Sequence, residues 1–297
     1  MLKIILVLLL ILLLIIGLGT HFVAPYAILQ PTRQPAAKTP ADEGLRYEDW
    51  SVEATAKPAI AAYYVYADRE TPLAHILLLH GIGSNKEAWI DLAGVLSKRG
   101  YATLLIDHRA QGQSEGEYAT FGHFEKHDIS RIIDRLEEAF PDLPLGVWGH
   151  SYGGAVALQA MAHDQRIDFG LSQSTFARLE QIVADYFQRF TAGWGPRWLA
   201  KYALRRAGKI AGFRPAEVQP IEAARQINQP MFIAHGEQDE NIKVKYGRAI
   251  YEALGSSEKE LAIIPGADHD DVGLKGGKEL FERQLQFVEE SIKLRGD

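Results

Sequence analysis

Short apolar runs alternate with helical patterns along most of this chain, and this alternation most narrows the folds it can adopt. Strands joined by crossover helices pair in parallel and are buried on both faces, so they appear as continuous apolar runs. The sequence therefore predicts an α/β fold with a mostly parallel central sheet and helices on both faces. The clearest runs are 76–79, 102–106, 145–148, 231–234 and 261–264, with a weaker one at 169–171.

Helices are predicted between these runs, where apolar residues recur at three- and four-residue spacing. They cover about 88–98, 125–140, 155–163, 244–254 and 278–292, and ranges 47–53 and 60–66 are predicted to form an antiparallel leading pair. A length of 297 residues with 47% hydrophobic residues suits one large domain with an appendage. The net charge of −6 argues against a nucleic-acid partner. The chain has no cysteine, which excludes disulfides, thiolate zinc sites and a cysteine nucleophile.

The N-terminus is a long apolar segment. Ile4–Gly19 contains no polar side chain, and continuation to Ala24 gives a helix of about 20 residues, enough to cross a bilayer core of about 30 Å. We therefore expect residues 1–29 to form a single-pass transmembrane anchor that contacts the lipid bilayer through residues 4–24. A cleaved signal peptide is the alternative, although Pro25 follows the best small residue for cleavage. Lys3 and the terminal amine favour a cytoplasmic N-terminus and a non-cytoplasmic main domain.

Residues 30–45 have the composition of a linker. Pro31, Pro35 and Pro40 stand among alanines and charged residues, which favours an extended stalk without a core of its own. The main domain is expected to span 46–297, with a cap insert at about 176–220.

The run 145–148 leads into Gly149-His-Ser-Tyr-Gly153, which matches the pattern G-x-S-x-G. The pattern alone is weak, but here it stands between a predicted strand and a predicted helix, as a nucleophile elbow requires. Glycines let the backbone turn sharply enough to present the hydroxyl above the sheet. Ser151 is thus the predicted nucleophile, and a structural serine that caps the helix is the alternative.

A serine hydroxyl needs a base, and in α/β sheets ligands bind beyond the carboxyl ends of the strands. His269 follows the last predicted strand, whereas His150, beside the serine, is expected to point elsewhere. Asp239 follows the run 231–234 and is the preferred acid to orient the imidazole, ahead of its neighbours Glu237 and Glu240.

The oxyanion that forms on attack needs preorganised donors. The backbone N–H of Tyr152, directly after the nucleophile, is one candidate. The second is the backbone N–H of Ile82, in the loop after the first parallel strand.

These motifs together resemble those of α/β-hydrolases of the proline-iminopeptidase and monoglyceride-lipase type, over roughly residues 74–294. The resemblance implies the α/β-hydrolase fold, whose triad runs in the chain order serine, acid, histidine, as here. Ala110 departs from a common glycine, and Gln173-Ser-Thr-Phe176 departs from an acid-containing turn. The matching segments are His80–Gly83, Asp107–Ser114, Gly149–Gly154, His235–Asp239 and Gly266–His269.

The cap insert is rich in aromatic and cationic residues. It is expected to be helical, either packing its aromatic side on the core or forming a lid that meets the bilayer and admits lipid-like esters. His123 and His127 have a spacing that can hold zinc, but no third ligand is apparent, so we expect no metal there.

The sequence thus predicts a membrane-anchored serine hydrolase, esterase- or lipase-like, that cleaves carboxylic esters through an acyl-enzyme without a cofactor. Its expected partner is a small-molecule acyl ester, with lipid-derived esters among the candidates. A serine aminopeptidase or amidase is the enzymatic alternative, although it would want an acid in a cap that is basic here. A non-catalytic scaffold or ligand-binding protein is the alternative from another class; a pure binder would not need all three triad side chains.

Overall fold

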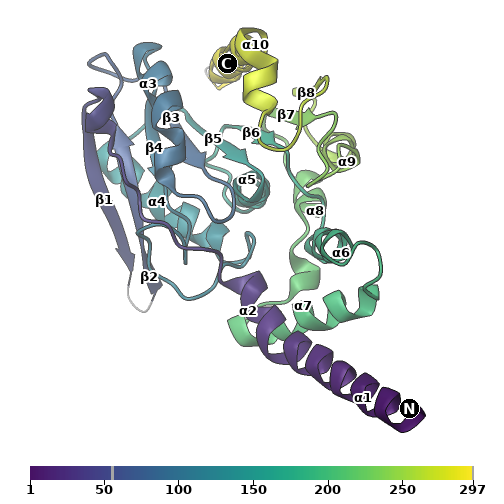
Figure 1. The fold of residues 1–297 in the computed structure, drawn as a ribbon. Coiled ribbons are helices and arrows are strands. Elements are labelled where there is room, and N and C mark those ends of the chain that lie inside the picture. Colours follow the sequence, from purple (N-terminus) through teal and green to yellow (C-terminus); the bar gives the residue numbers. More distant parts are fainter. Residues whose placement is uncertain (55–56, 296–297) are drawn as a thin grey trace.

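A single mixed sheet forms the centre of the molecule (Figure 1). The computed structural model describes residues 1–54 and 57–295, and within them eight strands lie in the order β1-β2-β4-β3-β5-β6-β7-β8. β1 pairs antiparallel with β2 and β2 with β4, while the other neighbours are parallel. The strands are β1 (Tyr47–Ala54), β2 (Lys57–Val65), β3 (His75–Leu79), β4 (Ala102–Ile106), β5 (Leu145–His150), β6 (Phe169–Gln173), β7 (Met231–Gly236) and β8 (Lys259–Ile264).

Helices cover both faces of this sheet, as the sequence predicts. Successive side chains of a strand point to opposite faces, so Ile76 and Leu78 pack on one side and Leu77 and Leu79 on the other. The first side carries α3 (Ile90–Lys98) and α10 (Val272–Leu294). The second carries α4 (Glu125–Ala139), α5 (Tyr152–His163), α8 (Pro220–Ala224) and α9 (Lys245–Ala253). The predicted α/β fold is confirmed.

A helical insert lies between β6 and β7, where the cap is expected. Its two main helices are α6 (Leu179–Phe190) and α7 (Arg197–Ala211), followed by the short 3-10 turn Pro215–Glu217 and α8. Asp185 of α6 accepts hydrogen bonds from Tyr246 of α9 and Arg197 of α7. The side chain of Asp185 therefore ties the two cap helices to the main domain.

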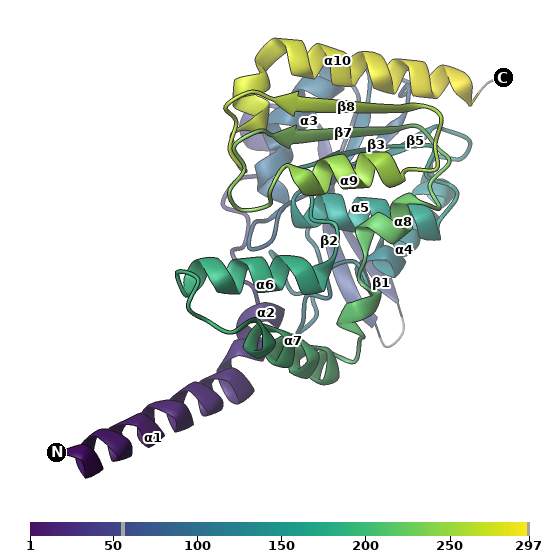
Figure 2. The same cartoon turned by 90° about the vertical axis from the view of Figure 1, so that its right-hand side faces the viewer.

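The N-terminal segment is a helix that projects from the domain (Figure 2). It comprises α1 (Leu2–Leu18), a π-helical turn at Gly19–Val23 and α2 (Ala24–Leu29). These 28 residues contain an 18-residue window with a mean hydropathy of 3.1, so the helix is long and apolar enough to cross a membrane. Signal sequences share these two properties.

The C-terminal end of this N-terminal segment contacts the cap. The π-helical turn and α2 pack on α7, and Nδ1 of His21 lies 2.6 Å from the hydroxyl of Tyr202. Pro25 and Leu29 are buried, and the carbonyl of Leu29 accepts a hydrogen bond from the N–H of Ala119. The helix is therefore joined to the main domain at its C-terminal end.

Residues 30–45 differ from the free stalk that their composition favours. The guanidinium of Arg33 donates to the carbonyl of Gly116, and the backbone N–H groups of Ala37 and Lys38 donate to the carboxylate of Glu87. Pro40 is buried at the start of a 3-10 turn, Pro40–Glu43. Extended backbone exposes its N–H and C=O groups, so a neighbouring surface with matching polar groups can hold it without any apolar core.

Candidate active site

The turn between β5 and α5 has the geometry of a nucleophile elbow. Ser151 has φ 55° and ψ −113°, a backbone conformation that a residue with a side chain adopts only when its surroundings enforce it. The enclosure is tight, because a Cβ on Gly153 would lie 2.0 Å from the carbonyl oxygen of Leu79. Only glycine allows helix α5 to approach strand β3 so closely.

Ser151, His269 and Asp239 lie in one hydrogen-bonded chain. Nε2 of His269 is 2.9 Å from Oγ of Ser151, and Nδ1 of His269 is 2.8 Å from Oδ2 of Asp239. The serine follows β5, the aspartate follows β7 and the histidine follows β8, so all three stand beyond the carboxyl ends of parallel strands. The sequence expectation of where these side chains meet agrees with this arrangement.

The carboxylate of Asp239 is held in its charged form. Burial acts to raise the pKa of Asp239, but the nearby imidazole of His235 and hydrogen bonds from His269 and the backbone N–H of Ile242 outweigh it and hold the pKa well below its usual range. His235 donates from Nε2 to the carbonyl of Ile242 at 2.6 Å and lies 3.4 Å from Oδ2 of Asp239. Asp239 is thus an ionised acceptor at neutral pH, which fixes the tautomer of His269 with a proton on Nδ1.

The sequence led us to expect that His150 points away from the site, but the structure places it within the site. Its Nε2 donates to the backbone carbonyl of His269 at 3.1 Å, and the two rings are 5.1 Å apart. Burial lowers the pKa of His150, so the ring is neutral. His150 is the last residue of β5, and this position at the carboxyl end of a parallel strand is the signal that could have identified it.

The loop after β3 brings Ile82 to the same pocket as Ser151. A Cβ on Gly81 would lie 3.7 Å from Cβ of Ser151, so the loop backbone passes directly beside the serine. Tyr152 is the first residue of α5, and its N–H is one of the groups at a helix N-terminus that have no partner within the helix. Both predicted oxyanion donors are therefore backbone groups at the serine.

A buried ion pair holds that loop. Nζ of Lys86 donates to Oδ2 of Asp107 at 2.7 Å, and the backbone N–H of Lys86 donates to Oδ1 of the same carboxylate. Lys86 is 1% exposed and Asp107 0%, so the charges depend on each other for compensation. Gln111 adds a hydrogen bond from the N–H of Gly83 to its Oε1, at 2.7 Å.

The two departures from the family pattern have local structural consequences. Ala110 has φ 60°, the left-handed region that favours glycine and costs other residues about 1 kcal/mol. In the turn at 173–176, the carbonyl of Gln173 accepts from the N–H of Ser151 at 2.7 Å, and Oγ1 of Thr175 donates to the carbonyl of Ser151 at 3.3 Å. This turn therefore supports the elbow through a hydroxyl and a backbone carbonyl.

A pocket of about 580 Å³ opens at Ser151 and His269. Its lining is apolar between α3 and α10, and Asp270 contributes the one carboxylate among its lining residues in the described part of the chain. Such a pocket, with a few polar groups at one end, suits an acyl chain whose carbonyl lies at the serine. The apolar residues are Ile82, Ala88, Trp89, Leu92, Trp148, Leu274, Leu280 and Phe281, with Tyr186 of the cap.

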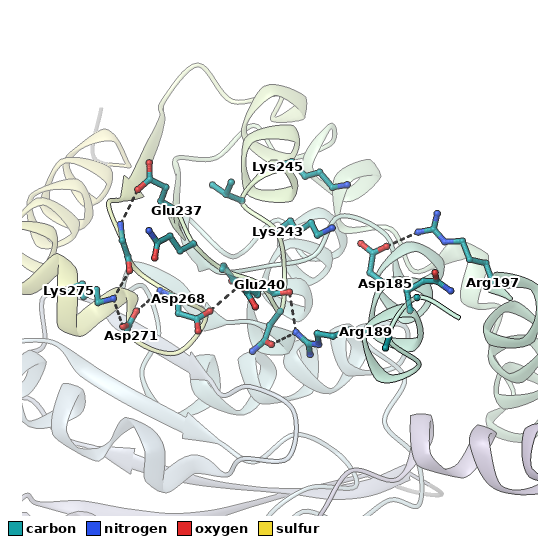
Figure 3. A pocket seen from close by; sticks show the side chains of 18 residues that line it. Asp185, Arg189, Arg197, Glu237, Glu240, Lys243, Lys245, Asp268, Asp271 and Lys275 are labelled. Atoms are coloured by element: carbon teal, nitrogen blue, oxygen red, sulfur yellow. Dashed lines mark hydrogen bonds and ion pairs between the residues drawn. The ribbon is translucent and has the colours of Figure 1, made fainter. Parts of the chain in front are cut away.

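A wider groove of about 1410 Å³ lies on the other side of Asp239, between the cap and the loops after β7 and β8 (Figure 3). Its charged side chains face one another from the two walls, and many are paired. Arg189 donates to the carbonyl of Glu240 and to Asn241, and Lys275 pairs with Asp271. Ser151 and His269 do not line this groove, so we assign the chemistry to the smaller pocket.

Metal-ligating atoms gather at one place in residues 1–54 and 57–295. His150, His269 and Asp270 offer ligand atoms within 4.8 Å of one another. Both ring nitrogens of His269 already contact Asp239 and Ser151, so we assign no metal to this group. His123 packs on Phe213 and His127 on His163, and neither belongs to a cluster of three ligands in the described residues.

Comparisons with known proteins agree on the type of fold. A family model described as the alpha/beta hydrolase fold matches residues 74–212. The esterase Pf2001 of Pyrococcus furiosus has a similar structure, with a TM-score of 0.73 at 23% identity, covering 90% of this chain and 98% of the esterase.

Similar sequences cover either most of the chain or about a third of it. The protein YqkD of Bacillus subtilis is 27% identical over 286 residues, which is 91% of each chain. The monoglyceride lipase of Mus musculus is 33% identical over 94 residues, which is 31% of each chain.

Proposed function

Because this chain is a member of the α/β-hydrolase superfamily, we propose that it is a serine hydrolase that cleaves carboxylic esters through an acyl-enzyme. The observation that carries the proposal is the continuous chain from Oγ of Ser151 through His269 to Asp239, with distances of 2.9 and 2.8 Å. A structural serine that merely caps a helix would need neither a buried imidazole nor an ionised acid beyond it.

Each group has a role in the proposed reaction. Oγ of Ser151 attacks the ester carbonyl carbon while Nε2 of His269 accepts its proton, and ionised Asp239 stabilises the imidazolium. The oxyanion accepts hydrogen bonds from the N–H groups of Tyr152 and Ile82. The tetrahedral intermediate collapses, the C–O bond to the alcohol breaks, and His269 protonates the leaving oxygen. Water, deprotonated by His269, then attacks the acyl-enzyme and releases the acid and free Ser151.

Labelling with a fluorophosphonate probe tests the nucleophile. The wild-type protein is expected to react and the Ser151→Ala variant to remain unlabelled, because the probe phosphonylates an activated hydroxyl. Ser84→Ala is the matched control, since Ser84 lines the same pocket and should leave labelling intact. Persistent labelling of Ser151→Ala would refute the nucleophile assignment.

A substrate panel tests the reaction class. We expect hydrolysis of p-nitrophenyl esters from acetyl to palmitoyl, with a preference for chains that fill the apolar part of the pocket between α3 and α10. Aminoacyl amides belong in the same panel. Faster turnover of the amides than of every ester would favour the aminopeptidase instead.

We further propose that the N-terminal helix is retained as a membrane anchor, with the catalytic domain on the non-cytoplasmic side. Cleavage after Ala24 would remove His21 from its contact with Tyr202 and cut beside Pro25, which is buried in the domain. Intact mass of the membrane-extracted protein should therefore include residues 1–24. A mature chain that begins at Pro25 would contradict this proposal.

A further inference from the structure

We infer that the tip of the cap is a bilayer-docking surface that turns the catalytic pocket towards the membrane. The cap tip is defined by the aromatic residues Phe190, Trp194 and Trp198 with the cations Lys201 and Arg205 of α7. This inference rests on the membrane anchor proposed above and adds a second point of attachment. It also narrows the substrate class to esters that partition into the bilayer.

The length of the anchor determines how far the cap lies from the membrane surface. α1 has 17 residues, and at about 1.5 Å per residue it spans about 25 Å, slightly less than a hydrocarbon core of about 30 Å. The residues that follow, Gly19–Leu29, already contact α7. There is no free stalk between the span and the protein, so α7 must lie at the polar–apolar boundary of the bilayer.

The aromatic side chains of the cap tip are exposed to a degree that a soluble surface does not explain. Phe190 is 91% exposed, Trp194 90% and Trp198 66%, although the three come from one helix end, one turn and the next helix start. Tryptophan in particular is enriched at membrane–water boundaries, where its ring is partly apolar and its N–H can meet polar groups. Figure 2 shows the α6–α7 turn projecting on the side from which α1 leaves.

The cations of α7 lie on the same exposed stripe as Trp198. Positions 198, 201 and 205 are three and four residues apart and exposed, while Ala200, Leu204 and Ala207 face the core. No carboxylate in residues 1–54 and 57–295 pairs with Lys201 or Arg205 within 4.0 Å. Cations beside membrane-inserted aromatics attract anionic headgroups, so the occupant that fits this surface is an anionic lipid bilayer.

The catalytic pocket opens towards the same side. Strands β7 and β8, which carry Asp239 and His269 beyond their carboxyl ends, point towards the side where α1 projects (Figure 2). Leu274 lines the pocket at 84% exposure, which places an apolar residue at its rim.

Site-specific fluorescence tests the docking in the full-length protein. The chain has no cysteine, so a single cysteine can be introduced and labelled with an environment-sensitive fluorophore without background. Three positions suffice: Leu10→Cys in α1, Trp194→Cys in the cap tip and Leu294→Cys at the far end of α10. Each is reconstituted in vesicles of phosphatidylcholine and phosphatidylglycerol, with and without a nitroxide-labelled lipid.

We expect the nitroxide lipid to quench the probes at positions 10 and 194 severalfold and to leave the probe at 294 unchanged. Quenching at 10 without quenching at 194 would overturn the docking inference while leaving the anchor intact, and would point to a protein partner for the cap tip. An unquenched probe at 10 would refute the anchor and the docking together. Equal quenching at 194 and 294 would mean adsorption without orientation and would also overturn the inference.

Kinetics separate docking from catalysis. In Phe190→Ser/Trp194→Ser, each lost aromatic should shift the equilibrium between docked and undocked cap by about tenfold. Because fewer molecules are then docked, the rate of hydrolysis of a long-chain ester in vesicles should fall. A water-soluble acetyl ester should be cleaved at the wild-type rate. Equal rates on the vesicle ester would contradict the inference. If neither substrate is cleaved by the wild-type protein, the proposed ester hydrolysis is wrong, and the quenching experiment still decides the docking.

Discussion

His150 donates a hydrogen bond from Nε2 to the backbone carbonyl of His269, at 3.1 Å, and so holds the loop that carries the proposed base. Replacing His150 by Phe keeps an aromatic ring but removes the donor. Loss of one such bond is worth about 1 kcal/mol, so kcat should fall about fivefold to tenfold with little change in KM. Steady-state kinetics on a soluble ester measure this split. An unchanged kcat would show that the loop after β8 needs no support from His150.

Asp239→Asn should nearly abolish turnover. An amide in place of the carboxylate can no longer stabilise the imidazolium or fix the proton on Nδ1 of His269, so kcat should fall by about 10⁴-fold. Glu237→Gln and Glu240→Gln are matched controls, because both acids belong to the same loop and neither contacts His269 in the described structure. Comparable losses in a control variant would reassign the acid.

Acid should destabilise the fold below about pH 6.5. Burial lowers the pKa of His75 from 6.5 to about 4, so the unfolded chain binds a proton at pH 5 that the folded chain rejects. Stability from this group is present above pH 6.5 and is lost as the pH falls towards 4. Between pH 7 and pH 5 the loss should be about 2 kcal/mol.

The contribution of His75 can be isolated with His75→Phe. This variant leaves the hydroxyl of Tyr64, 3.1 Å from Nε2 of His75, without its partner, so it should be less stable at pH 7. It should nevertheless lose less stability than the wild type between pH 7 and pH 5, measured by urea unfolding in detergent. Parallel losses in the two proteins would contradict the assignment.

Breaking the ion pair between Lys86 and Asp107, which holds the loop after β3, should lower the stability of the fold. Lys86→Met leaves the carboxylate of Asp107 buried without a counter-charge, which should lower the free energy of unfolding by about 3 kcal/mol. The double variant Lys86→Met/Asp107→Asn removes both charges and should recover part of that loss. Urea unfolding measures both, and a double variant less stable than Lys86→Met would show that the carboxylate contributes through its backbone hydrogen bonds instead.

The sheet and the elbow could be predicted because their signals are local. The run Met231–Ala234 is apolar throughout because the strand it belongs to, β7, is buried on both faces. β6 gave the weakest pattern, since Gly170 interrupts it. The structure gives the reason: a Cβ at Gly170 would lie 2.3 Å from Sδ of Met161 and 2.8 Å from that of Met231, so only glycine fits between neighbouring side chains.

Other features depend on contacts between segments far apart in the sequence, and such contacts produce no periodic pattern of apolar residues from which they could be predicted. A lysine such as Lys86 is expected at the surface, yet it is 1% exposed and its ammonium group donates hydrogen bonds to the buried carboxylate of Asp107 and to Gln113. The contact between His21 and Tyr202 joins residues 181 positions apart. His21 belongs to an apolar helix and Tyr202 to an amphipathic one, and neither helical pattern indicates a contact with the other segment. Composition predicted the helix at the N-terminus and the aromatic cap but gave no indication that they touch.

The direct contact between the N-terminal helix, our proposed anchor, and α7 has a consequence for kinetics. A domain held to the bilayer without slack meets its substrate by diffusion in two dimensions. With the anchor and the ester hydrolysis that we propose, the rate should follow the mole fraction of ester among the lipids and be insensitive to the total volume of the suspension. Dilution of the ester with inert phospholipid should slow the reaction, whereas dilution of the vesicles with buffer should leave the turnover of each enzyme molecule unchanged.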